Sequence, residues 1–149
     1  MAFTGNFMCT SFKQQLLEAV HGFRTSGGDT FKLALYTNSA SFTAATTTYT
    51  ASNEVSSANY TAGGGSLVIP ASNPTVGGTI AFTDFNDFTW TSVSFTARGA
   101  LLYNNTPTHT YTNATCVVLD FGSDKTASGQ DFTVVFPTAS NTAAIIRIA

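Results

Sequence analysis

Beyond its first 28 residues, the chain shows the patterns of β-strands and no helical pattern. In residues 30–37, Phe31, Leu33 and Leu35 alternate with other residues, which places apolar side chains on one face of a strand. Clusters of glycine, asparagine and serine separate such segments at the spacing typical of a sandwich or barrel. We therefore expect a mainly β fold, an antiparallel, jelly-roll-like β-sandwich over residues 30–149.

The second half of the chain carries the densest strand patterns. Between Trp90 and Val93 the apolar set shifts by one residue, which indicates a bulge or a tight connection. Residues 100–103 are apolar without interruption, as expected for a strand buried on both faces. Two further strands are expected over residues 115–121 and 131–136, with glycine-containing turns between them.

One helical pattern precedes the strands. We predict an amphipathic helix over residues 11–23, because its apolar residues fall on a single helical face. Ser11 and Gln14 have the spacing of a capping box. Such helices usually cover a sheet of their own chain, and docking on another subunit is the alternative. The apolar face comprises Phe12, Leu16, Ala19, Val20 and Phe23.

The flanking segments complete a single domain of 149 residues. Residues 1–10 are expected to form an N-terminal arm in which Phe3, Phe7 and Met8 are candidate subunit contacts, unless the arm packs on its own sheet. Residues 43–62 are rich in threonine, serine and alanine and have few apolar anchors, which predicts a long surface loop or an extended arm.

Composition excludes several classes of function. Charged residues make up 9% of the chain and the net charge is −2, so no basic face is available for nucleic acid. No stretch approaches the roughly 20 apolar residues that span a bilayer, and the N-terminus does not resemble a signal peptide. We therefore expect neither a nucleic-acid nor a membrane partner. Cys9 and Cys116 are expected to be free thiols, one of them buried in a strand.

Charged residues are scarce in this chain, and threonine, serine and asparagine are abundant instead. There are 26 Thr, 14 Ser and 10 Asn, or 50 of 149 residues. A neutral hydroxyl surface suits dense packing of subunits, because few charges lose their hydration at the contacts. The alternative is an all-β protein that carries threonine on its solvent faces because threonine favours strands.

The residues that could carry chemistry are scattered. His21 and His109 have no serine or cysteine nucleophile at a recognisable spacing, so a hydrolase triad is not expected. Two cysteines and two histidines placed singly do not form a zinc pattern. The sequence therefore predicts no enzyme, no metal and no cofactor.

The acidic residues allow two functional interpretations and a structural one. Asp84 and Asp87 lie three apart, and Asp120 and Asp124 flank a glycine turn ahead of Asp131. Paired carboxylates could hydrolyse a glycosidic bond or hold calcium. The structural interpretation, that aspartates in turns accept backbone hydrogen bonds, is favoured because no EF-hand pattern is present.

Arg98 stands at the start of a very apolar strand, where an arginine usually needs a carboxylate partner. We expect a buried ion pair between Arg98 and one of Asp84, Asp87 or Asp120.

Aromatic residues crowd into residues 82–95. An exposed row of them would suit a carbohydrate-binding module. They are mostly phenylalanine and alternate with polar residues, which favours a packed core. The set is Phe82, Phe85, Phe88, Trp90 and Phe95.

Segments covering most of the chain resemble small structural proteins of tailed bacteriophages. The resembling segments are residues 6–23, 31–37, 60–64, 82–90, 96–103, 118–122, 132–136 and 145–148. They are structural signatures and include no catalytic motif. The resemblance implies a virion component without enzymatic activity.

A virion component works by contacts repeated under symmetry. We expect a capsid decoration or cement protein, with a tail, neck or fibre-attachment component and a carbohydrate-binding module for host attachment as alternatives. The expected partners are copies of the chain itself, as a homo-oligomer and a trimer if it decorates the head, and the major capsid protein or other virion proteins. The expected location is the virion, after synthesis in the host cytoplasm and without secretion.

Overall fold

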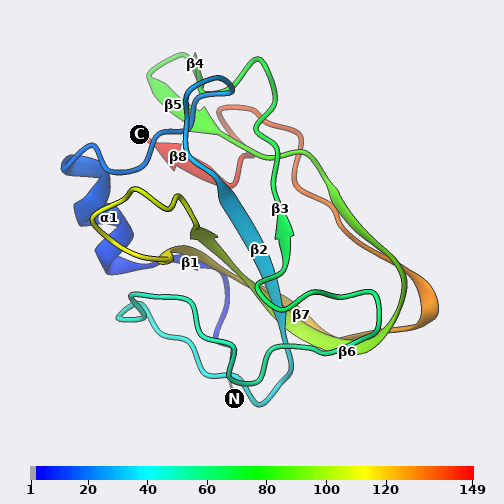
Figure 1. The fold of residues 1–149 in the computed structure, drawn as a ribbon. Coiled ribbons are helices and arrows are strands. Elements are labelled where there is room, and N and C mark those ends of the chain that lie inside the picture. Colours follow the sequence, from blue (N-terminus) through cyan, green and yellow to red (C-terminus); the bar gives the residue numbers. More distant parts are fainter. Residues whose placement is uncertain (1–2) are drawn as a thin grey trace.

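The computed structural model describes residues 3–149 and consists mainly of two antiparallel sheets, consistent with a β-sandwich (Figure 1). The larger sheet has the strand order β1-β7-β6-β2-β3 and the smaller one β4-β5-β8. The mainly β prediction is therefore confirmed. The elements are β1 (Phe7–Met8), α1 (Thr10–Leu17), β2 (Phe31–Tyr36), β3 (Gly65–Ser66), β4 (Thr75–Gly77), β5 (Ile80–Thr83), β6 (Phe88–Asn104), β7 (Ala114–Val134) and β8 (Ile146–Ile148).

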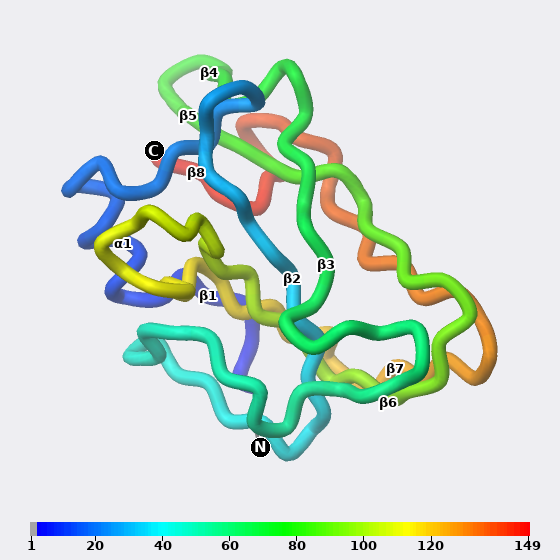
Figure 2. Tube along the Cα trace, in the orientation of Figure 1, coloured from blue at the N-terminus to red at the C-terminus, as the bar shows by residue number. Residues whose placement is uncertain are grey.

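A long hairpin of β6 and β7 dominates the larger sheet. The two strands pair from Phe88 opposite Val134 to Asn104 opposite Ala114. Along β6, only the residues that follow Arg98 pair with β2. The other halves, residues 88–97 and 125–134, therefore continue beyond the sheet as a two-stranded ribbon, which curves along the right of Figure 2. We call this part the ribbon.

The glycines within β7 form irregularities of one continuous strand, so the predicted turns between residues 115–121 and 131–136 are wrong. Gly129 is left without a partner where Val93 pairs with Gln130 and Ser94 with Ser128, and its φ is +63°. A positive φ suits glycine in a bulge, which lets the ladder continue past the extra residue. The predicted irregularity after Trp90 is confirmed by the register shift there.

The helix is shorter than predicted and ends at Leu17 instead of residue 23. Ala19 has a φ of +56°, and the Val20 N–H bonds back to the Gln15 carbonyl, which closes the helix. The predicted capping box is also wrong, because the helix begins after Cys9 without a side-chain cap.

Residues beyond the helix reach the core as extended chain. Phe23 stacks on Phe31 of β2 with ring centroids 4.5 Å apart. Its apolar character is therefore explained by the core and not by a helical face. Both cysteines are free and buried, and Cys116 lies in β7, as expected.

The core is continuous and centres on the strands that are covered on both faces. Residues 100–103 of β6 are all buried, as their unbroken apolar run predicts. Residues 43–62 contain no helix and no strand, yet Val55 and Tyr60 are buried against the sheet. Within residues 3–149, no helix has the length and apolar character needed to cross a membrane.

Candidate functional site

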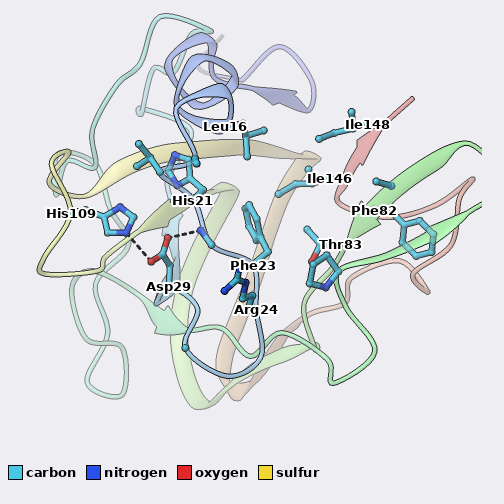
Figure 3. A pocket seen from close by; sticks show the side chains of 16 residues that line it. Leu16, His21, Phe23, Arg24, Asp29, Phe82, Thr83, His109, Ile146 and Ile148 are labelled. Atoms are coloured by element: carbon cyan, nitrogen blue, oxygen red, sulfur yellow. Dashed lines mark hydrogen bonds and ion pairs between the residues drawn. The ribbon is translucent and has the colours of Figure 1, made fainter.

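A network of two histidines and one aspartate lies between the end of α1 and the end of β6 (Figure 3). The Asp29 carboxylate accepts three hydrogen bonds, from the Gly22 backbone N–H at 2.7 Å, the Asn104 Nδ2 at 2.8 Å and the His109 Nε2 at 2.8 Å. It thereby joins three segments that are far apart in sequence. These bonds hold the pKa of Asp29 below its usual value although burial opposes them.

The hydrogen bonds of His21 define its tautomer. Its Nδ1 lies 3.0 Å from the amide nitrogen of Asn104, which can only donate, so Nδ1 accepts. Its Nε2 therefore carries the proton and donates to the Gln15 Oε1 at 2.8 Å. Burial lowers the pKa of His21 to about 4, more than the opposing attraction of Asp29 raises it. The His21 ring is thus neutral near pH 7.

A histidine bonded to an aspartate is also part of a hydrolase triad. A pocket adjoins the network, but its lining includes no serine and no cysteine. The Nδ1 of His109 is buried and has no hydrogen-bond partner within residues 3–149. The hydrogen bonds of the network fasten the segment after α1 to Asn104 at the end of β6.

A second carboxylate, Glu54, fastens the long loop. It accepts hydrogen bonds from the Tyr49 hydroxyl at 2.6 Å, the Tyr60 hydroxyl at 2.6 Å and the Gly63 N–H at 2.8 Å. The Tyr103 hydroxyl of β6 donates to the Gly63 carbonyl at 2.7 Å, which ties the loop to the larger sheet. This tyrosine cluster explains how residues 43–62 keep a defined path without secondary structure.

The predicted ion-pair residues are brought together in part. The Arg98 Nε lies 3.1 Å from the Asp120 Oδ1, and both side chains are largely but not fully buried. Asp120 also accepts from the Gly5 N–H at 3.0 Å, and these bonds lower its pKa although burial opposes them. Asp84 and Asp87 do not contact Arg98.

Asp84 and Asp87 accept backbone hydrogen bonds, as the structural interpretation predicts. Asp84 is 1% exposed and accepts from the N–H groups of Phe85 at 2.9 Å and Ile145 at 3.2 Å. Asp87 accepts from the Phe136 N–H at 2.8 Å. Burial raises the pKa of Asp84. Among residues 3–149 there is no group of three His, Cys, Asp or Glu side chains that could hold a metal ion.

The candidate contacts of the N-terminal segment lie against the chain's own sheet. Phe3 is 1% exposed, so the expectation that it reaches a neighbouring subunit is wrong. Phe7 and Met8 form β1, pair with β7 and are half-buried. The segment packs as the edge strand of the larger sheet because its apolar side chains find their partners there, and Met1 and Ala2 lie outside the described residues.

Of the aromatic residues at positions 82–95, Phe82, Phe85, Trp90 and Phe95 are buried, as predicted, whereas Phe88 is half-buried. Trp90 is 6% exposed and its ring lies 4.6 Å from that of Phe88 and 5.8 Å from that of Tyr60. A carbohydrate platform needs an exposed aromatic face, which Trp90 does not offer. This observation disfavours the carbohydrate-binding alternative.

The free edge of β7 carries an apolar groove. Strand β1 pairs with β7 only at Val117 and Val118, so beyond Asp120 the outer edge of β7 has no strand partner within residues 3–149. Val135 is 71% exposed, and the half-buried Phe121 lies beside Phe132 with ring centroids 6.2 Å apart. We call this surface the edge groove; it is lined by Phe121, Lys125, Phe132, Thr133, Val134 and Val135.

The outward face of the ribbon is rich in hydroxyl groups and carries one exposed carboxylate, that of Asp131. Across β6 and β7, Thr89 lies opposite Thr133 with their hydroxyl oxygens 2.7 Å apart, and Thr96 lies opposite Thr126 at 2.8 Å. These side chains are solvent-accessible. Their hydroxyl groups are already paired, so this face exposes few strongly hydrated groups.

Sequence reasoning missed the two carboxylates that organise the loops. Asp29 and Glu54 bond to groups up to 80 residues away, and no local spacing signals such partners. A weak signal exists for Glu54, which is the one charged residue between Lys32 and Asp84, whereas Asp29 has Arg24 and Lys32 close by in sequence. Comparison of the chain with protein-family models, curated protein sequences and solved structures found no match.

Proposed function

We propose that this chain is a non-enzymatic structural protein of a tailed-bacteriophage particle, and that it acts through repeated contacts with copies of itself and with other particle proteins. The observation that carries the proposed contacts is the edge groove, where a long unpaired strand edge and an apolar surface coincide, whereas the assignment to a phage particle is supported by the resemblance of the sequence alone. An unpaired edge offers backbone donors and acceptors to another strand. The flanking apolar side chains add contact area that is favourable to bury.

The neighbouring surface favours the same function. The ribbon carries paired threonine hydroxyls on its outward face, so a subunit packed against it removes few charges from water. Lys125 is the cationic side chain of the edge groove and lies at its accessible rim. The occupant we propose for the edge groove is a second copy of this chain, which makes the protein a homo-oligomer.

The first role within the particle is decoration or cementing of the head shell, where the chain contacts the major capsid protein. A tail, neck or fibre-attachment role is the alternative, which the same surface would serve. The two differ in copy number, which quantitative mass spectrometry of purified particles measures against the shell protein. A number close to that of the shell protein supports decoration, a small fraction of it supports the tail or neck, and absence from particles overturns the virion assignment.

Self-association is tested with one charge at the edge groove. Val135→Lys should weaken association at least about tenfold in sedimentation, because a buried unpaired ammonium is costly at an interface. Val68→Lys is the matched control, since Val68 is 59% exposed and lies outside the edge groove. A wild-type chain that stays monomeric at all concentrations, or equal effects of both variants, would contradict this contact surface.

A further inference from the structure

A pocket of about 400 Å³ lies between α1, the long loop and the segment that joins β6 to β7, which is drawn in yellow beside α1 in Figure 1. It shares no residue with the pocket beside the histidine network. Its lining within residues 3–149 consists entirely of side chains with a hydroxyl or amide group, none of which is ionised near pH 7. The residues that the argument uses are Gln14, Gln15, Thr47, Thr110, Tyr111 and Thr112.

Two walls of the pocket come from distant segments that hydrogen bonds hold together. Thr48 and Ala114 form an isolated β-bridge, and the Thr48 hydroxyl donates to the Thr112 carbonyl at 3.1 Å. The Tyr49 N–H donates to the Asn113 carbonyl at 3.0 Å. The threonine-bearing walls are therefore in place before any ligand arrives.

Gln15 supplies a hydrogen-bond donor from the helix. Its side chain is 4% exposed, and its Oε1 accepts from the His21 Nε2 at 2.8 Å, which fixes the orientation of the amide. The Nε2 at the other end of this amide has no hydrogen-bond partner among the described residues, yet the protein does not fully enclose it. A ligand in the pocket can therefore accept a hydrogen bond from it.

Glu18 orients two further lining side chains. Its carboxylate accepts from the Gln14 Nε2 at 2.8 Å and from the Tyr111 hydroxyl at 2.9 Å. These bonds leave the Gln14 Oε1 as a free acceptor and hold the ring of Tyr111, which is 36% exposed. The negative charge of Glu18 next to the pocket opposes an anionic ligand, and its oxygens already accept hydrogen bonds.

The remaining groups match the chemistry of a sugar. Thr47, Thr110 and Thr112 are exposed, and their hydroxyl groups have no hydrogen-bond partner within the described part of the chain. Each hydroxyl can donate and accept, as the hydroxyl groups of a sugar do. A sugar ring also has a face of C–H groups that can pack on an aromatic ring. Threonine is common on this protein, but here its hydroxyl groups converge with oriented amides and an accessible tyrosine.

We infer that this pocket binds a short neutral saccharide, with one sugar ring packed on Tyr111 and its hydroxyl groups bonded to Gln14, Gln15 and the three threonines. Pockets with a few oriented polar groups and an aromatic side chain are typical of small-molecule sites. The site does not involve the buried aromatic residues at positions 82–95. It shares no residue with the edge groove, so the inference does not depend on the proposed assembly role.

The probes are four neutral trisaccharides, namely cellotriose, triacetylchitotriose, mannotriose and galactotriose, each titrated into the full chain and followed by NMR. We expect at least one of them to bind saturably, one molecule per chain. The shifted signals should be the backbone amides of residues 11–15, 47–48 and 110–112 and the side-chain NH₂ group of Gln15. Absence of saturable binding by all four, or shifts confined to other residues, would overturn the inference.

The preference for a neutral ring is tested with matched ligands. Oxidation of the primary alcohols of the saccharide that binds gives its acidic counterpart, which should bind at least about threefold more weakly at low salt because Glu18 repels it. Glucitol has the hydroxyl groups of glucose but no ring, and it should show no saturable binding. Equal or tighter binding of the acidic counterpart, or saturable binding of glucitol at the same residues, would refute a site for neutral sugars.

Variants at exposed positions test the contacts. Tyr111→Ala should weaken binding about tenfold, whereas Tyr111→Phe keeps the ring and should stay within about threefold of the wild type. Thr112→Val should weaken binding about fivefold, and Thr126→Val on the ribbon is its matched control and should have no effect. Unchanged affinity of Tyr111→Ala, or equal losses for the two threonine variants, would contradict the assigned contacts.

Val135→Lys separates this site from the assembly surface. It should weaken self-association in sedimentation and leave saccharide binding unchanged, because Val135 lies in the edge groove. Loss of saccharide binding in this variant, with the fold intact by circular dichroism, would place the saccharide at the edge groove and overturn the inference.

Discussion

Glu54 and Asp29 each fasten a loop to the larger sheet, but they do so through different hydrogen-bond donors. Each carboxylate accepts three hydrogen bonds from separate segments and holds a loop without secondary structure against the larger sheet. The donors to Glu54 include two tyrosine hydroxyls, and those to Asp29 include a histidine next to a second, buried histidine. The number of bonds is equal, but the chemistry of the donors differs.

This difference predicts where each cluster responds to pH. Burial raises the pKa values of Tyr49, Tyr60 and Tyr103, the last to about 12, so the donors of the tyrosine cluster keep their protons over the ordinary range. The histidine network contains a ring that is neutral when folded and readily charged when unfolded. The tyrosine donors to Glu54 therefore stay protonated, whereas the histidine network contains a ring, that of His21, whose pKa differs between the folded and the unfolded chain.

The largest expected effect on the free energy of unfolding follows from the loss of the Glu54 carboxylate. Glu54→Ala should lower the free energy of unfolding by about 4 kcal/mol, because it leaves Tyr49, Tyr60 and the Gly63 N–H without their acceptor. Urea unfolding followed by tryptophan fluorescence measures the change, and Trp90 lies against Tyr60. Glu54→Gln should cost less, about 1–2 kcal/mol, because its remaining oxygen still accepts hydrogen bonds.

Glu18→Ala is the matched control for Glu54→Ala. Glu18 also accepts a tyrosine hydroxyl, that of Tyr111 at 2.9 Å, but this bond is exposed. Its loss should change the free energy of unfolding by less than about 0.5 kcal/mol. Similar losses for the two glutamates would show that burial does not distinguish them and that the loop has other anchors.

The next effect is the pH response of the histidine network. The unfolded pKa of His21 is near 6.5 and the folded one is about 4, so the unfolded chain takes up a proton first as the pH falls. The stabilising contribution is complete above pH 6.5 and disappears on acidification towards pH 4. At about 1.4 kcal/mol per pKa unit, the loss is about 3 kcal/mol.

Urea unfolding at several pH values between 7 and 4.5 measures this loss, and the same series on His21→Gln supplies the reference. Asp29 and Asp120, whose pKa values are lowered, lose their contributions only below this window, and Asp84, whose pKa is raised, acts in the opposite direction. These groups are present in both proteins, so the difference between the two series reports the imidazole of His21. Parallel curves would contradict the assignment of the pH response to His21.

The two clusters also show which parts of the structure can be predicted from the sequence. The β class, the buried strand at residues 100–103 and the irregularity after Trp90 follow from apolar periodicity, which is a local property. The helix ends six residues before its predicted end, because Val20 and Phe23 continue a helical period although both follow the helix, and Phe23 packs in the core as extended chain. Periodicity reports which side chains are buried, and tertiary packing decides in which conformation.

The glycines and the isolated acids show the limit of local reasoning. Gly122 and Gly129 look like turn residues, but the hydrogen bonds of β6 carry β7 past them as bulges. Asp29 and Glu54 could not be assigned at all, because their partners are set by the topology of the sheet. The apolar strand after Arg98 predicts a carboxylate partner for it, but the choice among the candidates Asp84, Asp87 and Asp120 depends on the fold, which selects Asp120.

A smaller effect is expected for the Arg98–Asp120 pair. Both side chains keep some contact with water, so Arg98→Ala should cost about 1 kcal/mol and lower the melting temperature by about 2–4 °C. The loss should shrink in 0.5 M salt because screening weakens the pair. Arg147→Ala, which removes an exposed arginine bonded to a backbone carbonyl, serves as the control. An unchanged melting temperature for Arg98→Ala would mean that the pair does not stabilise the fold.

The smallest expected effect has the opposite sign and concerns the pocket beside the histidine network. The Tyr49 and Tyr60 hydroxyls of the tyrosine cluster both donate a hydrogen bond to Glu54. The buried Thr83 hydroxyl, in contrast, has no hydrogen-bond partner among residues 3–149. Thr83→Val removes the unpaired hydroxyl and keeps the volume, so it should raise the free energy of unfolding by about 0.5 kcal/mol. The paired and exposed Thr89 is the control, because Thr89→Val should bring no such gain. A loss of stability on Thr83→Val would show that this hydroxyl has a bonding partner in solution, and the difference between the two clusters would then lie in their protonation chemistry alone.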